Sequence, residues 1–249
     1  MEETIPMSWT EEENTKKQVA INYTKIKSNV YVFEGDLNSS DKTIVIDPTP
    51  TRLWGTYYGG EGMEYPSDIK NDLSNNIYIS GSSTSQNNIA TSGTHQSDLN
   101  GARNLFIAKL DLNSNRIWGT FLVAEGGTLN SQSCRLAIDS NYNVYVTGNE
   151  LNDSSMGTAG TFQEFKNNFH EGYLVKLNLN GIKQWGTYFG GNGNETVYAI
   201  CLDSNENIYV AGQTFSTDFN TLPTAFQNTM NGSSDGFIIK FDTTGNRVW

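Results

Sequence analysis

The sequence has few basic residues, and this scarcity limits its partners. It holds 16 Lys and Arg against 27 Asp and Glu, a formal net charge of −11. A surface that binds nucleic-acid phosphates or anionic lipid headgroups needs clustered Lys and Arg. Apolar runs are also short, and none approaches the roughly 20 residues that span a bilayer. The composition therefore predicts no nucleic-acid partner and no membrane insertion.

Cysteine and proline are scarce as well. The two cysteines, Cys134 and Cys201, cannot build a disulfide framework or a four-ligand zinc site. Counted from Asp139 and Asp203, they fall on opposite faces of their predicted strands, so we do not expect a disulfide between them. We expect both to be small buried apolar residues. The start of the chain has neither a basic segment nor an apolar one, so it is not a secretory signal peptide.

Aromatic residues, by contrast, make up 12% of the chain and recur at regular intervals. Trp-Gly-Thr occurs at Trp54, Trp118 and Trp185, and Trp249 follows at the same spacing of 64 to 67 residues. Other segments repeat in the same phase, which chance does not explain. One set of corresponding segments is 76–81, 143–148 and 207–212. A second set is 106–111, 173–178 and 237–242.

Each repeat contains four short β-branched or aromatic segments bounded by Asn, Asp, Gly and Ser, a pattern typical of strands joined by tight turns. In the second repeat we predict strands at 105–111, 115–122, 134–139 and 143–148. Four antiparallel strands per repeat, with one aromatic residue at a fixed place, are typical of a propeller blade. The predicted fold is therefore all-β. It is an incomplete β-propeller of about three four-stranded blades plus the first hairpin of a fourth, preceded by a short β-rich segment.

The repeat phase also gives the predicted domain boundaries. Residues 1–42 lie outside the repeats, and 43–249 form the propeller repeats. The predicted units cover about 43–104, 105–172 and 173–235, with a partial unit at 236–249. Because closed propellers have roughly four to eight blades, we expect the chain to be a stretch of a larger protein whose further blades pack against it.

The repeats resemble the bacterial SBBP β-propeller repeats. The resemblance rests on Trp-Gly-Thr-aromatic-aromatic-Gly-Gly at 54–60 and 185–191, on the Asp-Ser-Asn runs at 139 and 203, and on Phe-Ile-x-Lys-(Leu/Phe)-Asp. It covers about 43–249. It implies an exported or cell-surface bacterial protein. It also implies that 1–42 are the end of an upstream β-rich domain. Residues 18–46 would then contain the closing hairpin of that domain and the lead-in to the first blade.

Several residues could carry chemistry, but each has a structural interpretation that we favour. The Trp residues are expected to dock neighbouring blades rather than stack on sugars. The runs Asp-x-Asn-x-Asn at 139 and 203 are expected to form hairpin turns, with calcium binding as the alternative. His95 occupies the position of Phe162 and Phe226, so it is expected to pack there partially. His170 lies in a link between strands.

We therefore predict no catalytic, cofactor-binding or metal residues and no cofactor. The favoured function is a non-catalytic scaffold for binding or adhesion, whose carbohydrate or protein ligand would contact the variable links 82–104, 149–172 and 213–236. One alternative is a propeller enzyme. It would act on polysaccharide through two acids that the sequence does not single out, or it would be a quinoprotein-type dehydrogenase. The other alternative is a purely structural spacer.

Overall fold

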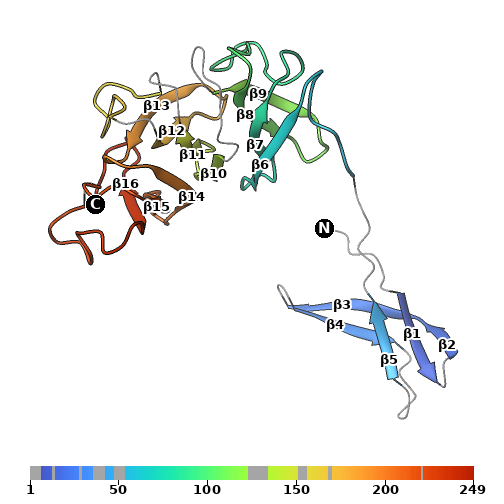
Figure 1. The fold of residues 1–249 in the computed structure, drawn as a ribbon. Coiled ribbons are helices and arrows are strands. Elements are labelled where there is room, and N and C mark those ends of the chain that lie inside the picture. Colours follow the sequence, from blue (N-terminus) through green and yellow to red (C-terminus); the bar gives the residue numbers. More distant parts are fainter. Residues whose placement is uncertain are drawn as a thin grey trace. The chain divides into compact units, whose positions relative to one another are not determined.

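The computed structural model describes residues 7–12, 15–27, 30–35, 43–47, 54–122, 134–150, 156–167, 170–219 and 221–249. All regular secondary structure in these ranges is β-strand, as predicted. No helix in the described part of the chain is long and apolar enough to cross a membrane. The chain divides into two compact units, Met1–Gly55 and Thr56–Trp249 (Figure 1).

The N-terminal unit contains a three-stranded sheet of order β2-β1-β5 and a separate hairpin of β3 and β4. The hairpin lies inside the segment 18–46, where a closing hairpin was predicted. The strand that begins at Thr43, however, pairs antiparallel with β1, with Val45 opposite Trp9. It therefore belongs to the N-terminal sheet and does not open the first repeat. The strands are β1 (Met7–Glu12), β2 (Thr15–Val19), β3 (Ile21–Lys27), β4 (Val30–Gly35) and β5 (Thr43–Asp47).

The C-terminal unit contains three successive antiparallel sheets. The first sheet comprises β6 (Glu64–Asn71), β7 (Ile77–Ser83), β8 (Asn104–Leu110) and β9 (Arg116–Phe121). The second sheet comprises β10 (Cys134–Ile138), β11 (Val144–Glu150), β12 (Glu171–Leu177) and β13 (Lys183–Phe189). The third sheet comprises β14 (Glu195–Leu202), β15 (Ile208–Thr214) and β16 (Asp235–Phe241).

The strands themselves lie where the repeat predicts them. Their grouping into sheets, however, is shifted by half a repeat from the predicted units. The four segments predicted as one unit, 105–172, divide between the first and second sheets. Each long link therefore joins the second and third strands of a single sheet, rather than one sheet to the next. The last segment, 236–249, provides the third strand of the third sheet and not the first hairpin of a fourth.

The backbone of the links explains this grouping. In the first two sheets the link folds back over the fourth strand, and Thr91 and Thr158 donate their backbone N–H groups to the carbonyl oxygens of Gly119 and Gly186, both at 2.8 Å. The outer edge of the fourth strand is thereby covered, so the following strand must begin a new sheet.

The apolar core lies between the sheets. One cluster of buried side chains joins the first sheet to the second and includes Ile107, Leu136 and Val175. Another joins the second sheet to the third and includes Leu174, Val197 and Ile239. Two thin sheets thus bury their faces against each other, which is how a four-stranded repeat gains stability.

The two cysteines differ in burial, which shows where the core between the sheets ends. Cys134 is buried in the first cluster, as predicted. Cys201 is exposed, so the prediction for this residue is wrong. It occupies the position of Ala137, which is buried against the third sheet. Cys201 lies on β14, whose corresponding face meets no further sheet in the described residues, and so nothing covers it.

Candidate functional site

Two of the four repeated tryptophans, Trp118 and Trp185, connect successive sheets of the C-terminal unit, whereas Trp54 and Trp249 are exposed. Trp118 on β9 donates its indole Nε1–H to the carbonyl oxygen of Leu179 in the second sheet, at 2.9 Å. Trp185 on β13 donates in the same way to Thr243 in the third sheet, at 3.1 Å. Both indoles are buried. Docking between neighbouring sheets, the predicted role of these residues, is confirmed for both.

A glycine in the receiving turn makes room for each indole. Gly181 and Gly245 have φ values of +74° and +87°, and a Cβ atom at either position would lie 2.9 Å from the Trp118 or Trp185 ring. The first sheet has Ser114 at the equivalent position, with φ of 67°. A side chain is therefore present where the other two turns receive an indole.

The links reinforce these contacts between sheets. The backbone N–H of His95 donates to the carbonyl oxygen of Gly181 at 3.0 Å, and that of Phe162 donates to Gly245 at 3.1 Å. His95 and Phe162 thus occupy the same structural position, as their alignment predicts. The first two links thus bind the fourth strand of their own sheet and a turn of the next sheet, so part of each of these two links is structural.

A Gln in each link fixes its shape. Gln96, Gln163 and Gln227 donate their side-chain Nε2–H to the carbonyl oxygen two residues further on, at 2.7, 3.0 and 2.9 Å. Gln163 and Gln227 also donate to an acid at the start of the third strand, Glu171 at 2.7 Å and Asp235 at 2.8 Å. The bond to the residue two positions on is thus common to all three links, and the bond to the acid is common to the second and third.

The Asp-x-Asn-x-Asn runs form hairpin turns, as predicted. Asp203 Oδ1 accepts the backbone N–H groups of Asn205 and Asn207, both at 2.9 Å, and its Oδ2 accepts the side-chain amide of Asn207 at 2.8 Å. The amide of Asn207, together with these backbone N–H groups, lowers the pKa of Asp203 to about 2. Asp139 is bonded in the same pattern. Both carboxylates serve to close a turn.

Sequence reasoning did not single out Glu64 and Glu195, which end two copies of Gly-Gly-x-Gly-x-Glu at 59–64 and 190–195. That shared motif was the available signal. Glu195 is buried, and its Oε1 accepts the hydroxyl groups of Thr214 at 2.8 Å and Ser216 at 2.5 Å. Burial raises its pKa, and these hydroxyl bonds partly offset the rise.

Glu171 is a second buried acid near Glu195, and its charge also contributes to the raised pKa. Its carboxylate accepts the side-chain amide of Gln163 at 2.7 Å and the backbone N–H of Asn167 at 3.0 Å. Both acids thus fix the links to the strands. His170 accepts a hydrogen bond from the backbone N–H of Glu195 at 3.1 Å through its carbonyl oxygen. In the described ranges no three His, Cys, Asp or Glu side chains gather as a metal site would require.

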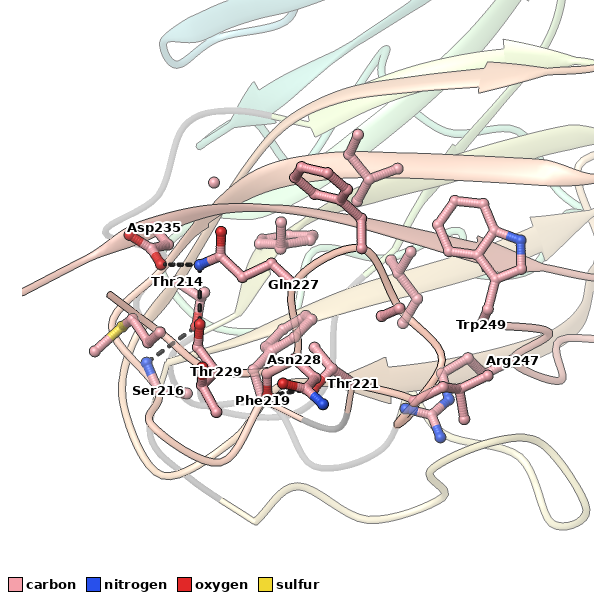
Figure 2. Close-up of a pocket in the computed structure, with 18 of the residues that line it drawn as sticks. Thr214, Ser216, Phe219, Thr221, Gln227, Asn228, Thr229, Asp235, Arg247 and Trp249 are labelled. Atoms are coloured by element: carbon pink, nitrogen blue, oxygen red, sulfur yellow. Dashed lines mark hydrogen bonds between the residues drawn. The ribbon is translucent and has the colours of Figure 1, made fainter. Parts of the chain in front are cut away.

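A pocket of about 710 Å³ lies in the third sheet, between its link and β16. Figure 2 shows Thr221, Gln227 and Asn228 of the link around this pocket, with Arg247 and Trp249 beside them. In the first two sheets the corresponding space, between link and third strand, holds the fourth strand. No motif in the sequence indicated a pocket at this place.

Two comparisons agree with this architecture. The chain is 23% identical over 226 residues to an uncharacterized WD repeat-containing protein of Acanthamoeba polyphaga mimivirus. The aligned region covers 79% of this chain and 16% of that relative, so the chain spans a small part of the relative's length. The SBBP β-propeller repeat model matches residues 184–220, from β13 into the third link. The resemblance expected from the Trp-Gly-Thr and Asp-Ser-Asn motifs is thus confirmed over this segment, which is similar to the SBBP β-propeller repeat.

Proposed function

We propose that the chain is a non-catalytic scaffold within an incomplete β-propeller, in which each of the three sheets is a blade. It belongs to an exported or cell-surface bacterial protein and binds a carbohydrate or protein ligand through the exposed sides of its links. The observation that supports the scaffold is the Trp contact, which recurs between successive sheets at 2.9 and 3.1 Å. A contact repeated in this way produces a rigid stack.

The links support the binding part of the proposal. The backbones of the first two links are fixed by bonds to the fourth strand and to the next sheet, while side chains such as Ser92, Ser97 and Phe165 remain exposed. Phe165 exposes 67% of its surface. Variable side chains on a fixed backbone are typical of recognition loops, which bind without a large ordering cost.

The test is a glycan array combined with a cell-adhesion assay, using the unmodified chain and the double variant Ser92→Lys, Phe165→Lys. We expect a binding signal that falls at least about tenfold in the double variant, a loss of about 1.4 kcal/mol. Leu112→Lys, at an exposed turn outside the links, is the matched control and should bind normally. Melting temperatures should agree among the three proteins.

The second candidate function is a structural spacer, favoured by the anchoring of the links to the strands. Absence of binding in both assays would overturn the recognition role and favour the spacer. Equal loss of binding in the Leu112 variant would instead contradict the assignment of the ligand to the links.

A further inference from the structure

Two buried acids meet where the third sheet packs against the second. Glu195 begins β14 and Glu171 begins β12, and both side chains are buried. A Cβ atom on Gly190 would lie 2.9 Å from Glu171 Cγ and closer still to Glu195 Oε2, so the two side chains approach each other across this glycine. Two carboxylates at such a place repel each other and lose their hydration, so one of them is favoured in its neutral form.

The hydrogen bonds of Glu171 suit a carboxylate. Its Oε2 accepts the side-chain amide of Gln163 at 2.7 Å, and its Oε1 accepts the backbone N–H of Asn167 at 3.0 Å. Each oxygen thus receives a donor, and a proton on either one would compete with that donor. Glu171 is therefore the acid of the pair that holds the negative charge.

The hydrogen bonds of Glu195 leave room for a proton. Its Oε1 accepts the hydroxyl groups of Thr214 at 2.8 Å and Ser216 at 2.5 Å. Figure 2 shows these two residues side by side, joined by a bond from the Ser216 backbone N–H to the Thr214 hydroxyl oxygen at 3.0 Å. Glu195 Oε2 is buried with no partner in hydrogen-bonding geometry among the described residues, although the backbone N–H of Gly191 acts on the carboxyl group. Both hydroxyls can thus bond to Oε1 while Oε2 carries a proton.

The backbone of Glu195 holds β14 to the second sheet. Its N–H donates to His170 O at 3.1 Å, and its carbonyl oxygen accepts the side-chain amide of Asn149. Asn149 Oδ1 in turn accepts the backbone N–H of Val197 at 2.8 Å. Glu195 is therefore part of the contact between the sheets, and a charge on its side chain acts directly on that contact.

We propose that the contact between the second and third sheets depends on a proton held by Glu195. In mild acid Glu195 is neutral and Glu171 is ionised. As the pH rises, Glu195 loses its proton to the solvent, and repulsion from Glu171 loosens β14 from the second sheet. The contact is thus tight in mild acid and weaker in alkaline solution. This inference concerns the scaffold itself and stands apart from ligand binding by the links.

The direction of the pKa shift agrees with this proposal. Burial raises the pKa of Glu195, and the charge of Glu171 adds to the rise. A carboxyl group with a raised pKa binds its proton more tightly in the folded state than in the unfolded chain. Its contribution to stability is complete below the unfolded pKa and is lost as the pH rises through the folded pKa. Asp203, whose pKa is lowered to about 2, loses its contribution as the pH falls toward that value, outside this range.

Other charged or titratable groups lie on the elements around Glu195. They remain in every variant compared below, so their own titration is common to all of the proteins. They are Arg135 on β10, whose Nε–H donates to Tyr198 O at 3.1 Å, Glu150 on β11 and opposite Glu171, His170 beside Glu171, and Asp218 in the third link, which accepts the backbone N–H of Asn192 at 2.6 Å.

The test is urea unfolding of the full 249-residue chain and of Glu195→Gln, monitored by Trp fluorescence at about pH 5 and about pH 8.5. The amide keeps an oxygen for Thr214 and Ser216 and does not ionise. We expect the two proteins to have similar stability at the lower pH. At the higher pH the folding equilibrium constant of the variant should exceed that of the unmodified chain at least about fivefold.

Glu64→Gln is the matched control. Glu64 Oε1 accepts the hydroxyl groups of Ser83 at 2.9 Å and Ser85 at 2.5 Å, but Glu64 is only half-buried and lies in the first sheet. The effect of this substitution should be the same at both pH values. An equal pH dependence in the Glu64 and Glu195 variants would overturn the assignment to the contact with Glu171.

Infrared spectroscopy gives a second measurement. The difference spectrum between the unmodified chain and Glu195→Gln at the lower pH should contain the carbonyl band of a protonated carboxyl group, and its absence would overturn the proposal. So would a Glu195→Gln variant that is the less stable protein at the higher pH, because the carboxylate would then be required. Stabilisation by millimolar Ca²⁺ at the higher pH that the variant lacks would place a cation between the two acids and overturn the assignment of a proton.

Discussion

The second and third sheets have nearly the same sequence pattern but differ in what covers them. Trp185 is 9% exposed, whereas Trp249, at the same repeat position, is 45% exposed. Leu174 is fully buried, and its counterpart Ile238 is 63% exposed. The strands form in both cases. Local sequence therefore determines the strand, and the neighbouring sheet determines whether its outward face is buried.

This difference locates the stabilising energy of the unit. Apolar burial contributes roughly 25 cal/mol per Å², and in this fold it comes from contacts between sheets more than from contacts within one. The second sheet has a neighbour on both faces, through the two core clusters. The third has such a cluster on one face among the described residues. Equivalent substitutions in the two sheets should therefore have unequal costs.

The largest contrast is expected from the two tryptophans. Trp185→Ala removes a buried indole and its bond to Thr243 O, so it should lower the free energy of unfolding by about 3–5 kcal/mol. Trp249→Ala removes a half-exposed ring that makes an edge contact with Tyr209, and should cost about 1 kcal/mol. Urea unfolding of the two variants measures both values. Equal costs would show that burial between sheets does not govern stability.

A smaller contrast tests how the indole is received. Gly181→Ala adds a Cβ atom 2.9 Å from the Trp118 ring, at a residue whose φ is +74°. It should lower the free energy of unfolding by about 2–3 kcal/mol. Gly160→Ala is the matched control, because Gly160 has a φ of +86° with nothing within 4 Å of an added Cβ. It should cost about 1 kcal/mol, from backbone strain alone.

Urea unfolding, monitored by Trp fluorescence, compares these two glycine variants. The difference between them measures the steric contact with Trp118 after the shared backbone strain is removed. If the two variants lose the same stability, the indole moves aside freely, and the glycine is required for its backbone conformation only.

Much of this architecture could be predicted from sequence. The spacing of the tryptophans gave the repeat, the alternation of residues gave the strands, and Asp203 with Asn207 gave the hairpin turn. These features depend on contacts within a few residues, which is why a local pattern indicates them. The docking role of Trp118 and Trp185 followed from their fixed phase in the repeat.

The grouping of strands into sheets could not be obtained in the same way. A repeat has no intrinsic start, so the period alone does not show which four strands share a sheet. That choice depends on the link, whose residues Thr91 and Thr158 bond to the fourth strand across 28 positions. The pocket depends on the same long-range contacts. Glu195 could have been noticed through the motif that it shares with Glu64, but its burial depends on the fold.

The smallest effect concerns the two cysteines, which differ in accessibility and not in stability. Cys201 is exposed on β14 and should react with a thiol reagent in the native protein. Cys134 is fully buried, and burial raises the pKa of its thiol, so the reactive thiolate is disfavoured. We expect one thiol to be labelled natively and both in denaturant, with Cys201→Ser abolishing the native reaction. Native labelling of both would mean that the first and second sheets separate. Labelling of neither would mean that the open face of the third sheet is covered in solution, which would remove the difference between the two sheets.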